Sequence, residues 1–126
     1  DDTPHRTAAS NLSAARLRLR KYDMAPLLAE DALARRRQVL GEDHPDTLMS
    51  ANNLATDLRR LGQHERALRL DEDTLVRRRR VLGEDHHNTL VSASDLAMDM
   101  RALGQHEEAR RLDEDTDTRR RRAAGD

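Results

Sequence analysis

The sequence predicts an all-α fold built as a stacked array of three antiparallel helix pairs. Three observations lead to this prediction: a long internal repeat, apolar positions at helical spacing within each repeat, and a near absence of aromatic residues. Aromatic residues make up 1% of the 126 positions, with one Tyr and no Phe or Trp. A core of Leu, Ala, Val and Met suits close-packed helices, because strands favour aromatic and β-branched residues.

A 42-residue internal repeat accounts for the whole chain. Residues 43–84 match residues 85–126 without a gap, and 27 of the 42 aligned positions are identical. Residues 1–42 fall into the same register. A repeat of this length indicates stacked supersecondary units that bury a continuous core between neighbours. We therefore predict a single repeat domain over residues 1–126, with units 1–42, 43–84 and 85–126.

The first helix of the second unit is predicted over residues 47–61. Pro45 and Asp46 favour its start, because proline is tolerated in the first helical turn and Asp suits the positive end of the helix dipole. Gly62 marks its end, as expected for a left-handed position after a helix. The apolar residues at spacings of three and four are Leu48, Ala51, Leu54, Ala55, Leu58 and Leu61.

The second helix of this unit is predicted over residues 65–82 and ends at Gly83. The third unit repeats the pair over residues 89–103 and 107–122. The end units look atypical, as expected for a repeat array. The first has Arg20 at the turn glycine and Pro26 in its second helix, and the last ends in two alanines. This weaker apolar end fits a solvent-facing cap or a fraying terminus.

The composition argues against several classes of function. The 23 basic and 24 acidic residues lack the basic excess of dedicated nucleic-acid binders. Cysteine is absent, which excludes disulfides and thiolate metal sites. No apolar run approaches the roughly 20 residues of a membrane span. No phosphate-binding glycine loop or nucleophile arrangement is present. We expect no catalysis, no cofactor, no membrane or nucleic-acid partner, and a cytoplasmic location.

A known family is indicated by specific residues of the second unit. These are the run Asn53-Leu54-Ala55, then Leu58, Leu61-Gly62, Ala67 and Thr74-Leu75. The pattern resembles the tetratricopeptide repeat (TPR). The longer period and the linker from Leu82 to His86 are similar to the kinesin-light-chain variety. The Arg-rich form is similar to arrays in actinobacterial proteins, where such arrays often follow a signalling NTPase module.

The resemblance implies a right-handed superhelix whose first helices line a concave groove for peptides or other protein segments. In this family the amide at the Asn11 and Asn53 position often bonds the backbone of a bound peptide. The residues that we expect to bind a peptide in the groove are Asn11, Asn52, Asn53, Thr56, Arg59, Arg60, Asp95 and Arg101.

Arginines in the groove predict the chemistry of its ligand. Arg59, Arg60 and Arg101 are suited to pair with carboxylates or phosphates in bidentate fashion. We therefore expect a protein or peptide partner of acidic character, although Asp95 would repel such a ligand locally. The alternative is that these are ordinary solvated helix residues.

The arginine runs 77–80 and 119–122 invite a nucleic-acid hypothesis. Four successive helical residues point around the whole helix, and acidic residues lie one to two turns earlier, so we expect a solvated, salt-bridged helix. The adjacent His86 and His87 suggest metal ligands, but no further ligand is spaced to complete a site. We expect these histidines to pack in the linker and predict no metal site.

Asp71 and Asp113 occupy a family position that faces the interior. A buried carboxylate needs a partner, and we expect Arg78 or an arginine of the adjacent unit to provide it.

Two hypotheses for function remain at this point. The first is a protein-binding scaffold, part of a larger signalling protein. The second is a structural module that self-associates, because short arrays with an exposed apolar end stack or swap readily.

Overall fold

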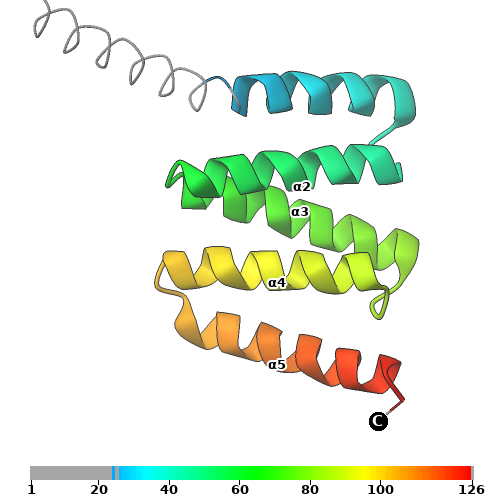
Figure 1. Cartoon of the computed structure of the whole chain (residues 1–126), viewed down its shortest axis with the longest axis vertical. Coiled ribbons are helices and arrows are strands. Elements are labelled where there is room, and N and C mark those ends of the chain that lie inside the picture. Colours follow the sequence, from blue (N-terminus) through cyan, green and yellow to red (C-terminus); the bar gives the residue numbers. More distant parts are fainter. Residues whose placement is uncertain (1–23, 25, 126) are drawn as a thin grey trace, which may run out of the picture.

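The computed structural model describes residue 24 and residues 26–125. After a helical segment over residues 26–40, four helices follow in order: α2 (Pro45–Arg60), α3 (His64–Leu82), α4 (His87–Ala102) and α5 (His106–Ala123). Consecutive helices pack against one another (α2 with α3, α3 with α4, α4 with α5), and they stack along the long axis of the molecule (Figure 1). The predicted all-α array of helix pairs is confirmed. The predicted first helix of unit one lies outside the described residues.

The helices begin and end close to the predicted positions. In the second unit, the predicted end at Leu82 matches that of α3, and the other three predicted helix ends differ from α2 and α3 by one or two residues. What the sequence did not indicate is the residue that caps α2 and α4. His44 and His86 each precede a helix, and Nδ1 accepts from the backbone N–H two residues later, at 3.1 Å and 3.0 Å. The linker histidines therefore satisfy helix N-termini, which otherwise have unpaired N–H groups.

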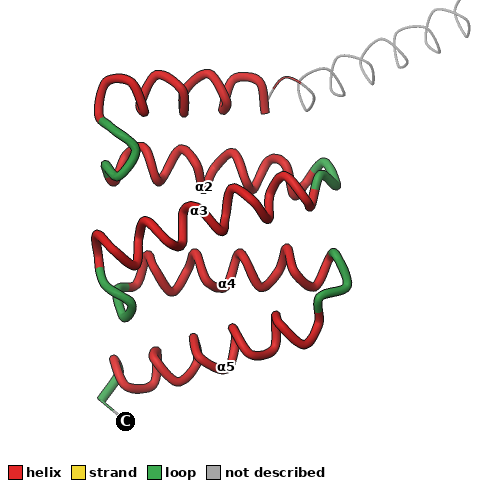
Figure 2. The backbone as a smooth tube through the Cα atoms, turned by 180° about the vertical axis from the view of Figure 1, so that it is seen from behind, coloured by secondary structure: helices red, strands yellow, loops and turns green. Residues whose placement is uncertain are grey.

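Short glycine turns reverse the chain between helices (Figure 2). Gly62 follows α2 with φ of 79°, in the left-handed region, and a Cβ there would meet no atom within 4 Å. The cost of a side chain at this position is therefore conformational, about 1–2 kcal/mol.

We expect Gly62→Ala to lower the free energy of unfolding by about 1 kcal/mol, measured by urea denaturation. Glu65→Ala, an exposed change just after the turn, is the control. Equal midpoints for the two variants would contradict a conformational role for Gly62.

The core is divided into two clusters, one at each described junction between units. The first contains Leu33, Ala51, Leu54, Leu58 and Ala67, which come from the 26–40 segment, α2 and α3. The second contains Leu75, Ala93 and Leu96, from α3 and α4. Each second helix therefore gives one buried leucine to the first helix of the next unit. Burial of a leucine contributes roughly 1.5–3 kcal/mol.

Candidate functional site

The candidate face is formed by the sides of α2 and α4 that are not buried against neighbouring helices. On α2, Asn53 and Arg60 are exposed, while Asn52 and Thr56 are half-buried. Exposed apolar side chains lie on the same face. Met49 of α2 is 54% exposed and Met98 of α4 is 43% exposed. Methionine is enriched at the surfaces through which proteins bind one another.

Asn52 and Thr56 are half-buried, and Thr56 forms a hydrogen bond within α2. Thr56 Oγ1 donates to the backbone carbonyl of Asn52 at 3.1 Å, a bond that helical threonines commonly form. Asn52 Oδ1 is buried and has no hydrogen-bond partner among the described residues. Asn11 lies outside the described residues. Of the two predicted amides that the structure describes, Asn53 is therefore the one that is exposed to a ligand.

Arg59 forms internal ion pairs instead of facing an open groove. Its Nε donates to Asp99 Oδ1 of α4 at 2.8 Å, and its Nη2 donates to Asp71 Oδ2 of α3 at 3.0 Å. The two carboxylates are 0% and 1% exposed, and the Arg59 side chain is 18% exposed. Three helices from two units thus meet at one guanidinium. Removing one member of such a buried ion pair leaves the other charge without its partner, which is strongly destabilising.

The predicted partner of Asp71 requires a correction. Asp71 does need an arginine, as expected, but the arginine is Arg59 of its own unit and not Arg78. Arg78 points to the next unit, where its Nη1 donates to Ser92 Oγ at 2.9 Å and to the Asn88 carbonyl at 3.1 Å. Seven residues separate Asp71 from Arg78, so both lie on one side of α3, yet the ion pair of Asp71 is with Arg59 of α2, whereas Arg78 bonds residues of α4.

The acidic residues around Arg59 outnumber the charges that balance them. Burial, together with a hydrogen bond to Asp99, raises the pKa of Asp71 to about 9. Burial also raises the pKa of Asp95, against the influence of Arg59. Asp99 Oδ2 is buried and accepts no hydrogen bond from the described residues. A proton on Asp71, shared with Asp99, is the arrangement that satisfies this pair.

Arg101 repeats Arg59 in the third unit, but in a more exposed setting. It pairs with Asp113 of α5, and the two side chains are 44% and 35% exposed. Asp113 is therefore not fully buried, contrary to the expected interior position. With both Arg59 and Arg101 engaged by carboxylates, Arg60 is the predicted groove arginine that is exposed and forms no ion pair among the described residues.

The arginine runs are salt-bridged in part: Arg77, Arg80 and Arg119 form ion pairs, whereas Arg78 is buried and not solvated, contrary to the expectation. Arg77 reaches Asp73 in its own helix and Asp43 in the linker before α2, at 3.0 Å and 2.9 Å. Arg119 makes the equivalent contacts with Asp115 and Asp85. These bridges fasten each second helix to the start of its own unit. The arginines therefore point in several directions and form no single basic stripe.

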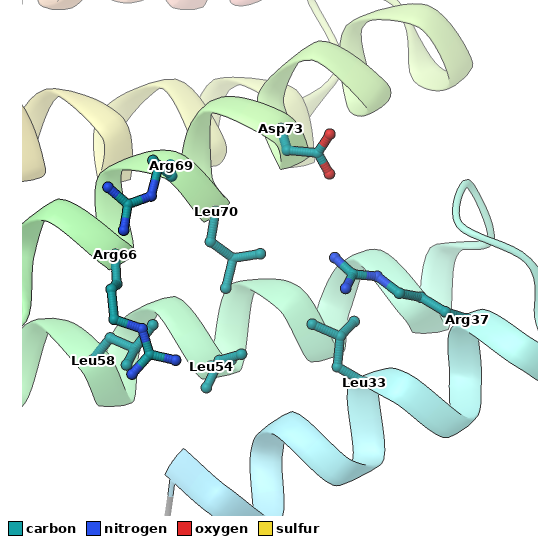
Figure 3. Close-up of a pocket in the computed structure, with 8 residues that line it drawn as sticks. All are labelled: Leu33, Arg37, Leu54, Leu58, Arg66, Arg69, Leu70 and Asp73. Atoms are coloured by element: carbon teal, nitrogen blue, oxygen red, sulfur yellow. The ribbon is translucent and has the colours of Figure 1, made fainter.

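A shallow cleft of about 330 Å³ lies between the 26–40 segment and α3, over α2. Figure 3 shows Leu33, Leu54 and Leu70 around its centre, with Arg37 and Asp73 at one end and Arg66 at the other. Arg66 already bonds Glu30 and Gln63. This cleft is a second candidate surface for binding a partner. The described part of the chain shows no cluster of metal-ligating residues and no helix that could span a membrane.

Comparison with known proteins decides the family. The tetratricopeptide repeat model matches residues 5–75 and 49–116, which together cover most of the chain. The chain belongs to the TPR family. It is also similar to the crystal structure of the nearly identical TPR-like repeats of a putative kinesin light chain from Podosopora anserina, and to the crystal structure of a substituted variant of the same repeats. In both comparisons the TM-score is 0.77 and the identity is 27%.

The match with the kinesin-light-chain repeats covers 92% of this chain and 55% of the other chain. This TPR chain therefore spans about half the length of the protein it resembles. No curated protein matches the sequence. The comparisons support the resemblance to kinesin-light-chain repeats and the scaffold type of fold, which in this family generally mediates contacts between proteins.

Proposed function

We propose that this TPR chain is a protein-interaction module that holds a segment of another protein across α2 and α4. The observation that carries the proposal is the pair of exposed methionines, Met49 and Met98, on the face that includes Asn53. Methionine adapts its shape to irregular apolar surfaces and is common where proteins bind varied partners. The amide of Asn53 can donate to and accept from a peptide group.

The expected ligand is less strongly acidic than the sequence suggested. Arg59 and Arg101 are paired with Asp99, Asp71 and Asp113. Of the predicted groove arginines, Arg60 is therefore the one that forms no ion pair with any residue that the structure describes. We therefore infer a segment that combines apolar side chains with an acidic one. As part of the same proposal, we assign the module to a larger cytoplasmic signalling protein, for which a cysteine-free sequence is well suited.

Photo-crosslinking locates the binding face directly. A photoreactive residue is placed at Asn53 or Met98, and for comparison at Arg69 in the cleft of Figure 3. We expect crosslinks to a partner from the native lysate at the first two positions only. Met49→Asp should lower capture at least about tenfold, because it replaces buried apolar contact with a charge. Crosslinking at Arg69 alone would move the function to the other surface.

Self-association through the C-terminal end receives little support from α5. Leu75 of α3 packs into the next unit, but the equivalent residue of α5 is Asp117, which is exposed. Arg110 likewise stands where α3 has Leu68. Charged side chains at these two positions favour contact with solvent over apolar packing. We expect sedimentation velocity to show a monomer across concentrations, and a concentration-dependent increase in mass would favour the self-association hypothesis instead.

A further inference from the structure

A second pocket lies at the junction between units two and three, beside the proposed binding face. It has a volume of about 250 Å³, which is below the usual range of small-molecule sites and closer to the size of one or two side chains. Met49, at its edge, also belongs to the binding face. Its lining residues come from α2, α3 and the start of α4, and are Asp43, Pro45, Leu48, Met49, Arg78, Val81, Leu82, His86 and Asn88.

The unusual residue in this pocket is Arg78. It is 7% exposed, yet no carboxylate among the described residues forms an ion pair with it. One of its three guanidinium nitrogens, Nη1, donates to Ser92 and Asn88, and Nε and Nη2 make no hydrogen bond to the described residues. Burial lowers the pKa of Arg78, although the more distant Asp95 and Asp71 act in the opposite direction. A buried cation without a direct counter-ion is costly unless a ligand provides one.

The other polar groups of the pocket do not provide a counter-ion for Arg78. Asp43 is already paired with Arg77 and Arg80, and the hydrogen bond from Arg77 lowers its pKa. His86 accepts from the Asn88 N–H through Nδ1, so a neutral imidazole holds its proton on Nε2, as a donor. The positive end of the α4 dipole lies at the same place and favours a negative charge.

We propose that this pocket binds an acidic side chain of the partner segment, with its carboxylate on Arg78 and its aliphatic stem against Leu48, Val81 and Leu82. The inference rests on the proposed function and adds one anchor to it. A leucine-like neighbour of the acidic residue would then contact Met49. The site combines both parts of the pocket, because Arg78 is 7% exposed among these side chains, and a bond between guanidinium and carboxylate is stronger where little water reaches it.

The test uses a matched pair of capped dipeptides on the full chain. N-acetyl-leucyl-glutamyl amide is titrated while NMR follows the Arg78 Nε–Hε signal and the Val81 and Leu82 methyl groups. N-acetyl-leucyl-glutaminyl amide differs only in its missing charge. We expect saturable shifts with the first, and binding of the second at least about tenfold weaker, as for the loss of a charged hydrogen bond. Equal shifts with both, or none with either, would overturn the proposal.

Two tryptophan variants separate pocket binding from unspecific attraction. Val81→Trp fills the pocket while leaving Arg78 in place. Val39→Trp makes the same change one unit earlier, at a position that is 80% exposed, compared with 46% for Val81. We expect the first to abolish dipeptide binding and the second to leave it unchanged. Arg78→Met should also abolish binding, provided that circular dichroism shows a native helix content.

The same variants distinguish this anchor from the general function. If Val81→Trp weakens the crosslinking of the partner at Asn53 about tenfold or more, the pocket is part of the binding face. If crosslinking persists in full, the proposed function stands and the anchor is refuted. If the dipeptide binds but no partner crosslinks at Asn53 or Met98, the proposed function fails while the pocket's preference for a carboxylate remains.

Discussion

Arg59→Ala is expected to lower the free energy of unfolding by about 3–5 kcal/mol, because it leaves the buried carboxylate of Asp99, beside the protonated Asp71, without a counter-ion. Asp71 and Asp99 are essentially inaccessible to solvent, so water cannot replace the guanidinium. Both carboxylates lose a hydrogen bond of 2.8–3.0 Å. Urea denaturation followed by far-UV circular dichroism measures the effect.

Arg101→Ala is the matched control, since Arg101 occupies the same position one unit later. Its pair with Asp113 is substantially exposed, and surface ion pairs contribute at most about 1 kcal/mol. The two variants remove the same side chain from the same place in a helix, so helix propensity cancels in the comparison. Similar losses of stability in both variants would show that the buried network contributes nothing special.

The second large effect concerns pH and the proton held by Asp71. Its pKa is raised from 3.8 to about 9, so the folded state holds a proton that the unfolded chain releases. The resulting stability is fully present below about pH 4 and is lost as the pH rises through about 9. The groups that face Asp71 are Arg59, Arg78, Asp95 and Asp99.

Asp71→Asn is expected to flatten this dependence and to make the protein more stable than the wild type at mildly alkaline pH. An asparagine amide donates to Asp99 as the protonated acid does, but cannot ionise. The measurement is the urea midpoint between about pH 5 and about pH 9. Asp113→Asn, at the half-exposed equivalent position, should leave the wild-type slope unchanged. A wild-type midpoint that is constant or rises over this range would refute the shared proton.

The sequence was sufficient to predict the helices but not the way in which their charges combine. Apolar spacing and turn glycines follow directly from local geometry, so helix ends were placed within two residues. The need of Asp71 for an arginine also followed, because burial of a charge is costly wherever it occurs. Which arginine pairs with Asp71 depends on how neighbouring helices are oriented across a junction between units. The spacing of residues in the sequence does not determine that orientation.

The candidate face likewise has one residue whose setting was predicted from the sequence and others whose setting was not. The family position of Asn53 predicted an exposed amide, and the structure places it in solvent. Arg59 was expected to bind a ligand, because an arginine near the end of a helix gives no sign that carboxylates of two other helices surround it. Asp99 was missed entirely. A signal for Asp99 was available in the sequence, because Asp57 and Asp99 are identical residues at equivalent positions of units two and three. Positions that are identical between the units differ in this respect from positions that vary.

The bridge from Arg59 to Asp99 has a consequence for how the array comes apart. Units that touch only through apolar contacts can peel away one at a time, as in a one-dimensional chain of weakly coupled elements. Here, detachment of the third unit removes Asp99 from Arg59 and forces the shared proton to redistribute. The last two units should therefore exchange their amide hydrogens in a single concerted opening, and the surface across α2 and α4 stays rigid enough to meet a partner without prior ordering.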